Sequence, residues 1–113
     1  LANGGTLGEA RILSPHSVRL MSTNFLTPEQ MDAFNWPMHA GYGFGLGFSV
    51  VPASVIGNSP GSAGQYTWGG IAGTTFWVDP RESLFAILMT QAPGRRNFYR
   101  PLFRNLVYQA LED

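Results

Sequence analysis

The stretch from residue 66 to residue 80 constrains the fold most, because two alternating segments flank a cluster of glycines. Tyr66 and Trp68 alternate with a smaller residue, and residues 74–78 alternate in the same way, which is the period of a β-strand. The segments are separated by Gly69, Gly70 and Gly73. Glycines in a strand pattern mark a bulge or a place where another group approaches the backbone closely. The stretch predicts a bent β-hairpin or, as a sharper hypothesis, a strand edge whose bare amides face a ligand, with Trp68 as one wall.

Apolar runs elsewhere complete an antiparallel sheet, with strands expected at about residues 42–51, 65–70, 73–79 and 84–91. In the first strand, large residues share one face and glycines line the other, so a structural neighbour or a ligand can come very close. The last strand is apolar on both faces, which predicts a central strand with one layer above and one below. The C-terminal helix supplies one layer, and the other must come from missing sequence or a partner.

Three helices are expected, which makes the fold class α+β. Ser14-Pro15 and the capping-box pair of Thr27 and Gln30 predict short helices near residues 15–22 and 28–34. A C-terminal helix at about residues 98–112 is expected to begin at a cap on Asn97 and to pack on one face of the sheet. Its apolar stripe consists of Phe103, Leu106, Val107, Ala110 and Leu111.

The low charge of the chain predicts that other protein covers part of its surface. Charged residues make up 12% of the 113 residues, about half of the usual ~25%. The segment Leu1 to Gly5 resembles the end of a helix whose body is missing. We therefore expect residues 1–113 to form a single partial domain, with self-association of the isolated chain as one consequence of its uncovered face.

The charge balance excludes two classes of partner. Seven basic residues balance seven acidic ones, which removes the electrostatic argument for binding nucleic acid or an anionic membrane. No apolar run approaches the ~20 residues of a membrane span and no signal-peptide pattern is present, so a soluble chain is expected, in a compartment that the sequence does not indicate.

No cluster of side chains predicts a metal site or a cofactor, and none is expected. His16 and His39 lack neighbouring acidic pairs, so each is expected at the surface or in a loop. Asp79 and Glu82 share a polar turn, where we expect them to be solvated rather than to form a general acid–base pair. The chain also lacks a phosphate-binding loop and a nucleophile elbow, and it contains no nucleophile with an activating base.

Residues 66–80, followed by the apolar strand and the final helix, resemble the C-terminal part of the β-lactamase and penicillin-binding-protein-like serine hydrolases. They are most similar to the esterases that share the class C β-lactamase fold. Asn3-Gly4-Gly5, Leu13-Ser14-Pro15 and the glycine repeat of residues 41–47 are also similar to that branch. The resemblance covers nearly the whole chain and implies that it is the C-terminal portion of a larger hydrolase fold.

The resemblance implies roles for four residues. The Trp-Gly-Gly motif of the esterases falls on Trp68, Gly69 and Gly70, which would line the substrate pocket. The next residue, Ile71, would supply one backbone N–H of the oxyanion hole, where such a donor stabilises a tetrahedral intermediate. The β-lactamase branches hold a substrate carboxylate with a lysine at the Trp68 position, so this chain implies a small neutral ester as substrate.

Two parts of the family machinery are absent. The nucleophile of the family lies in Ser-x-x-Lys and this chain has no lysine, and none of its tyrosines lies in the Tyr-x-Asn base motif. The chain alone is therefore predicted to be inactive, with the N-terminal part of the enzyme or a complementing chain as its partner. Two alternatives are a non-catalytic binding module with an aromatic face that includes Trp36, Trp68 and Trp77, and a structural fragment that only associates.

Overall fold

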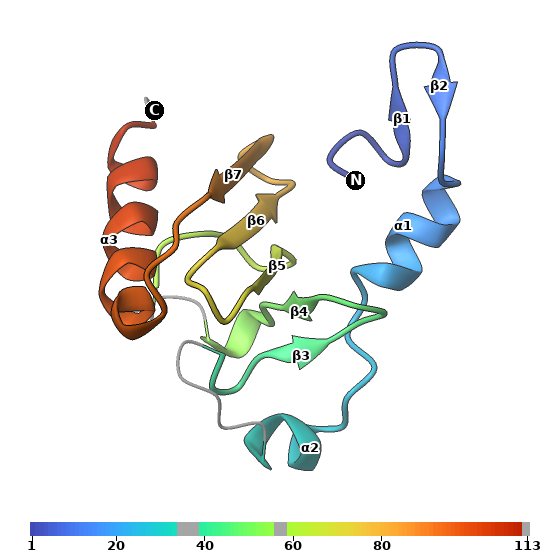
Figure 1. The fold of residues 1–113 in the computed structure, drawn as a ribbon. Helices are drawn as coiled ribbons and strands as arrows, with labels where there is room; N and C mark the ends of the chain where they lie inside the picture. Colours follow the sequence, from blue (N-terminus) through green and yellow to red (C-terminus); the bar gives the residue numbers. More distant parts are fainter. Residues whose placement is uncertain (34–38, 56–58, 112–113) are drawn as a thin grey trace.

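A five-stranded antiparallel sheet forms the centre of the computed structural model, and the C-terminal helix α3 packs across one of its faces (Figure 1). The structure describes residues 1–33, 39–55 and 59–111. The strands follow one another in the order β3-β4-β5-β6-β7, so each pairs with its neighbour in the sequence. Their bounds are Gly43–Phe44, Ser49–Val50, Tyr66–Gly69, Thr75–Asp79 and Leu84–Leu88. The predicted α+β class is confirmed.

The first predicted strand, residues 42–51, is wrong as a single strand, because it folds back on itself. β3 and β4 pair in an antiparallel hairpin, with Gly43 opposite Val50. The turn between them is closed by the N–H of Gly45, which donates to the carbonyl of Phe48 at 2.8 Å. Gly47 adopts a φ of +106°, a conformation that strongly favours glycine. The alternation of large and small residues is real, but the glycines also permit the reversal.

The close neighbour of these glycines is structural. The side chain of Asn24 accepts a hydrogen bond from the N–H of Phe44 at 3.0 Å. A Cβ on Gly43 would collide with that same side chain, and a Cβ on Gly45 would collide with the carbonyl of Met21. The segment between the two short helices therefore lies in the space that the sequence left open for a neighbour or a ligand.

Trp77 anchors α3 to the sheet. It lies at the middle of β6 between Thr67 of β5 and Ala86 of β7, and only 1% of its surface is exposed. Its ring is 5.5 Å from that of Phe103 and stacks at 6.0 Å on that of Tyr108. Both partners belong to α3, so this contact fixes the position of the helix.

The helix α3 spans Arg96–Gln109, and two details of its prediction are wrong. Asn97 lies within the first turn, and the residue before the helix, Arg95, makes no side-chain capping bond. In the predicted apolar stripe Leu106 is 55% exposed, whereas Arg104 is buried. The guanidinium of Arg104 lies 4.9 Å from the centre of the Trp77 ring, so a long side chain with a charged end covers the sheet in place of an aliphatic one.

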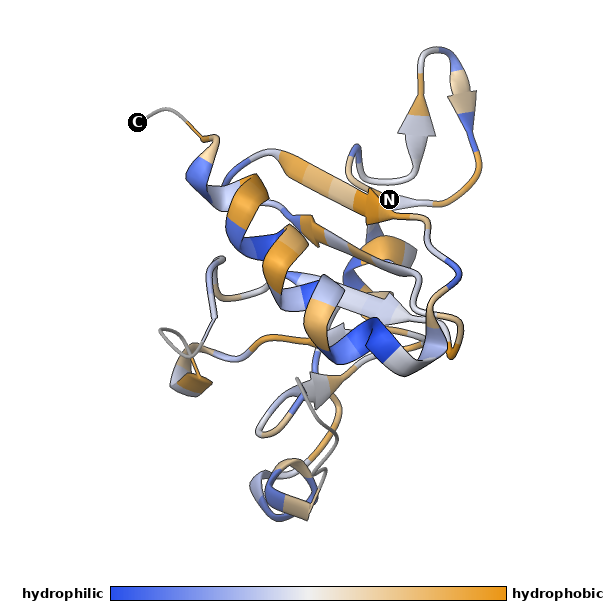
Figure 2. Ribbon diagram, turned by 60° about the vertical axis from the view of Figure 1, so that its left-hand side comes forward, coloured by the Kyte–Doolittle hydropathy of each residue, from blue (hydrophilic) through white to orange (hydrophobic). Residues whose placement is uncertain are grey.

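The strand β7 lies at the edge of this sheet, which corrects the prediction that it is central. One face of the strand meets α3 through Ala86, which is buried, whereas Phe85, Ile87 and Met89 on the other face are 62%, 56% and 80% exposed. Figure 2 shows that the whole strand is hydrophobic. The doubly apolar pattern is thus real, but the described residues supply only one of the two layers.

The N-terminal third extends away from α3 (Figure 1). It contains a small hairpin that the sequence did not predict, β1 and β2, at Thr6–Leu7 and Ala10–Arg11. The helices α1 (Pro15–Met21) and α2 (Pro28–Ala33) agree with the expected ranges; residue 34 lies outside the described residues. None of the helices within the described ranges is long and apolar enough to cross a membrane.

We expect Trp77→Ala to lower the free energy of unfolding by about 3–5 kcal/mol, because it leaves a cavity under α3. The matched change Phe85→Ala removes an aromatic ring from the exposed face of the neighbouring strand and should cost less than about 1 kcal/mol. Urea denaturation of both variants measures the difference. Equal losses would contradict the burial of Trp77 between the sheet and α3.

Candidate functional site

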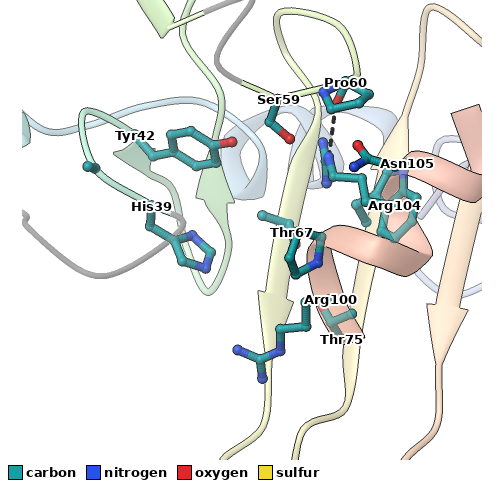
Figure 3. Close-up of a pocket in the computed structure, with 12 residues that line it drawn as sticks. His39, Tyr42, Ser59, Pro60, Thr67, Thr75, Arg100, Arg104 and Asn105 are labelled. Atoms are coloured by element: carbon teal, nitrogen blue, oxygen red, sulfur yellow. Dashed lines mark hydrogen bonds between the residues drawn. The ribbon is translucent and has the colours of Figure 1, made fainter. Parts of the chain in front are cut away.

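Two adjoining pockets lie where α3 crosses the sheet, and they share His39 and Arg100. The first, which we call the arginine pocket, has a volume of about 320 Å³ and is lined mainly by α3, β5, β6 and the loop residues shown in Figure 3. The second, the glycine pocket, has a volume of about 400 Å³. Its lining consists of Trp68, Gly69, Gly70 and Ile71 with His39, Arg96, Asn97 and Arg100.

All four residues predicted from the sequence therefore lie together in the glycine pocket. Trp68 and Gly69 belong to the end of β5, and Gly70 and Ile71 follow in the turn toward β6. The ring of Trp68 packs edge-on against Phe44 at 5.3 Å and lies 5.8 Å from His39. The indole thus forms an apolar wall; its role toward a substrate stays a prediction.

The turn after β5 leaves backbone donors unengaged, among them the N–H of Ile71. The N–H of Gly73 donates to the carbonyl of Gly70 at 3.1 Å, which makes Ile71 the second residue of a β-turn. In the part of the chain that the structure describes, no acceptor lies within hydrogen-bonding distance of the Ile71 N–H, and 77% of the residue is exposed. A free amide at a pocket wall is the feature that an oxyanion site requires.

The edge of β5 is also open beside this turn. β4 pairs with β5 only at Tyr66 and Thr67, so among the described strands the ladder on that side ends before Gly69. On the other side Gly69 pairs with Thr75 of β6. The open strand edge of the hypothesis is therefore observed, and a ligand beside it stays a prediction.

His39 connects the two pockets, although the sequence suggested only a surface or loop histidine. Its Nδ1 lies 3.0 Å from the hydroxyl of Ser49, and its ring packs edge-on against Tyr42 at 5.5 Å. Burial, together with the positive charges of Arg100 and Arg104, lowers the pKa of His39 from 6.5 to about 4. The ring is therefore a neutral group at pH 7.

Three arginines of α3 meet the loops around the pockets, and the sequence analysis missed them. Arg96 donates to the carbonyl of Ile71 at 3.3 Å, and Arg100 donates to the carbonyls of Gly70 and Thr74 at 2.6 and 2.8 Å. Arg104 donates to the carbonyl of Pro60 at 2.8 Å (Figure 3). Their spacing of i, i+4 and i+8 places them along one side of the helix, which is a signal that the sequence does carry.

Two other predictions need correction. Asp79 is fully buried rather than solvated, and its carboxylate accepts bonds from the Ser62 N–H at 2.9 Å and the Tyr108 hydroxyl at 2.8 Å. Burial and the adjacent carboxylate both raise the pKa of Tyr108.

Trp77 is buried, so it cannot contribute to an aromatic binding face, and Trp36 lies outside the described residues. Within residues 1–33, 39–55 and 59–111 no cluster of His, Asp or Glu side chains is arranged to hold a metal ion.

Comparison with known proteins gives relatives that are much longer than this chain. No family model matches the sequence. Protein Rv1367c of Mycobacterium tuberculosis is 38% identical over 96 residues, which are 80% of this chain and 24% of that protein. The chain thus spans about a quarter of the length of the curated relatives it matches.

Among solved structures, EstCE1, a hydrolase with promiscuous acyltransferase activity, matches with a TM-score of 0.76 and 24% identity. The match covers 95% of this chain and 26% of EstCE1. Simvastatin synthase (LovD) from Aspergillus terreus matches with a TM-score of 0.67 and 26% identity, over 89% of this chain and 30% of that enzyme. The chain therefore has the fold of a segment of these enzymes.

We expect acid to destabilise the folded chain through His39. The unfolded chain protonates this ring near pH 6.5, whereas the folded chain resists protonation until about pH 4. The free energy of unfolding should therefore decrease as the pH falls from about 7 to about 4. Urea denaturation at several pH values should show a smaller decrease for His39→Gln, and His16→Gln, at an exposed position on α1, should behave like the unmodified chain. An unchanged pH dependence in His39→Gln would contradict the lowered pKa.

Proposed function

We propose that this chain forms the oxyanion side and one pocket wall of a serine hydrolase that cleaves small esters by acyl transfer. The single observation that carries the proposal is the unengaged N–H of Ile71 at the wall of the glycine pocket. The fold that the chain shares with EstCE1 and simvastatin synthase supports the same reaction class.

In this reaction a serine hydroxyl attacks the ester carbonyl, and the carbonyl oxygen becomes an anion in the tetrahedral intermediate. The N–H of Ile71 would donate to that oxygen as the charge develops, together with the N–H of the nucleophile. Trp68 would form the apolar wall against which the acyl or alcohol group packs. The chain has no lysine and hence no Ser-x-x-Lys, so the nucleophile and its base would come from the rest of the protein.

The remaining sequence would also cover the open face of the sheet. Phe85, Ile87 and Met89 expose a continuous apolar edge, and the matched relatives are about four times as long as the region they share with this chain. Burying these side chains would contribute stability in proportion to the apolar area removed from water. We therefore assign the partner role to the remaining part of the same enzyme or to a complementing chain.

We expect Ile71→Pro to reduce kcat for p-nitrophenyl butyrate by about two to three orders of magnitude in the full-length protein, because it removes the oxyanion donor. Proline is well tolerated at the second position of a β-turn, so this variant should fold. Ile71→Ala is the matched control, because it removes the same side chain and keeps the N–H. Steady-state kinetics and a thermal melt of both variants make the comparison. A folded Ile71→Pro variant with full esterase activity would exclude the proposal.

The same protein should prefer the neutral ester to a cephalosporin, because Trp68 offers no charge to a substrate carboxylate. The guanidinium groups of Arg96 and Arg100, which line the same pocket, already bind backbone carbonyls. The loss of one charge-assisted bond corresponds to roughly a ten- to hundredfold lower kcat/KM. Efficient cephalosporin hydrolysis would contradict this substrate class.

The isolated chain of 113 residues should show no turnover of either substrate.

The isolated chain is also expected to self-associate and to bind a hydrophobic dye through β7, because open apolar edges pair with one another. The double variant Phe85→Ser, Ile87→Ser should reduce both effects. Leu7→Ser is the matched control, since Leu7 is 78% exposed but belongs to the separate β1–β2 hairpin. Sedimentation velocity measures the outcome, and a monomeric unmodified chain at high concentration would argue against it.

A further inference from the structure

Arg100 reaches from α3 to the turn after β5, where one terminal nitrogen binds two backbone carbonyl groups. Its Nη2 donates to the carbonyl of Gly70 at 2.6 Å and to the carbonyl of Thr74 at 2.8 Å. Gly70 and Thr74 close the base of the turn, because the N–H of Gly70 donates to the carbonyl of Thr74 at 2.9 Å. The guanidinium therefore ties both ends of the turn to the helix.

This contact fixes the direction of the amide that the proposed reaction uses. The carbonyl of Gly70 and the N–H of Ile71 belong to one peptide unit, which is planar and points the two groups in opposite directions. Holding the carbonyl on Arg100 therefore keeps the N–H of Ile71 on the side away from the guanidinium. The bond from Arg100 is charge-assisted and shorter than the 3.1 Å bond that the N–H of Gly73 makes to the same oxygen.

Gly69 provides a second, independent observation. A Cβ at this position would lie 2.7 Å from Nη2 and 3.0 Å from Cζ of Arg100, and 2.9 Å from the carbonyl oxygen of Thr74 that the guanidinium holds. The absence of a side chain at Gly69 thus makes room for the guanidinium against the strand. Gly69 therefore leaves space for the Arg100 side chain and also lines the glycine pocket.

The position of Arg100 carries a cost. Its Nε is buried and has no acceptor among the described residues, and burial lowers the pKa of Arg100, as does the charge of Arg96. An aliphatic side chain would cover the same surface without leaving a polar atom unsatisfied. The guanidinium is therefore explained by the two carbonyls that it holds.

We propose that Arg100 is a positioning residue, which orients the N–H of Ile71 toward the developing oxyanion. The inference rests on the function proposed above. Arg96, one turn earlier on α3, holds the next peptide unit less tightly through the carbonyl of Ile71 at 3.3 Å. Side chains from the first two turns of the helix thus bind the carbonyl groups of the peptide units on both sides of Ile71.

The test uses the full-length protein that carries this segment, with p-nitrophenyl butyrate as substrate and phenylboronic acid as an inhibitor that forms a tetrahedral adduct. Arg100→Gln should lower kcat by roughly ten- to a hundredfold and weaken boronate binding by a similar factor, while KM changes less than about threefold. Arg100→Lys should recover part of the loss, because an ammonium keeps the charge but not the planar fork. Arg11→Gln should change nothing, since this exposed arginine binds a carbonyl in another part of the chain, that of Leu13 at 3.3 Å.

Gly69→Ala tests the same group of atoms while keeping the arginine, because its Cβ would crowd both the guanidinium and the Thr74 carbonyl that it binds. It should displace the guanidinium and reproduce the defect of Arg100→Gln, and the double variant should lose no more than the larger single loss. Gly94→Ala is the matched control, because a Cβ there meets no atom within 4 Å. Should Arg100→Gln fail to fold, the comparison of Gly69→Ala with Gly94→Ala decides the question.

The outcomes separate the two proposals. Full kcat and full boronate affinity in folded Arg100→Gln or Gly69→Ala, together with an impaired Ile71→Pro, would refute the positioning role and leave the proposed function intact. Full activity in Ile71→Pro would refute both.

Discussion

The packing of α3 over Trp77 is the contact on which the other features depend. The indole is almost inaccessible at the middle of β6, where Phe103, Tyr108 and the guanidinium of Arg104 cover it. Because this contact fixes where the helix lies on the sheet, it also fixes which loops the side chains of Arg96 and Arg100 can reach. The glycine pocket is thus a product of helix–sheet packing as much as of the turn that forms its wall.

Most of the sheet could be predicted, because β5 and β6 alternate with the period of a strand and β7 is a short apolar run. The β3–β4 hairpin could not, since a run of alternating large residues and glycines is equally compatible with one long strand or with a reversal at Gly47. The edge position of β7 could not be predicted from its own sequence. Apolar residues on both faces of a strand indicate that both faces are covered, but they do not indicate whether this chain or other protein covers them. The misplaced cap at Asn97 reflects a helix held by its packing rather than by a capping bond.

Part of the candidate site, the backbone segment at the end of β5, could be predicted from the sequence. Gly69 and Gly70 could be selected because glycines in a strand indicate close approach, and Ile71 because it follows the motif that resembles the esterases. The structure brings all three to one pocket with Trp68. The side chains that approach from elsewhere could not be selected, because His39 and Arg100 reach this pocket only through tertiary packing. The helical spacing of Arg96, Arg100 and Arg104 was visible in the sequence. Their hydrogen-bond partners are backbone carbonyl groups, which every residue has, so the sequence does not indicate which of them the arginines bind.

The three arginines give α3 a defined register. Arg96 binds the carbonyl of Ile71, Arg100 binds those of Gly70 and Thr74 in the same turn, and Arg104 binds that of Pro60 in a different loop. A slide by half a helical turn, about 2.7 Å, would break these bonds together. A displacement of the helix along its axis would therefore disturb all of these contacts. Because Arg100 lines both pockets, both would change shape together.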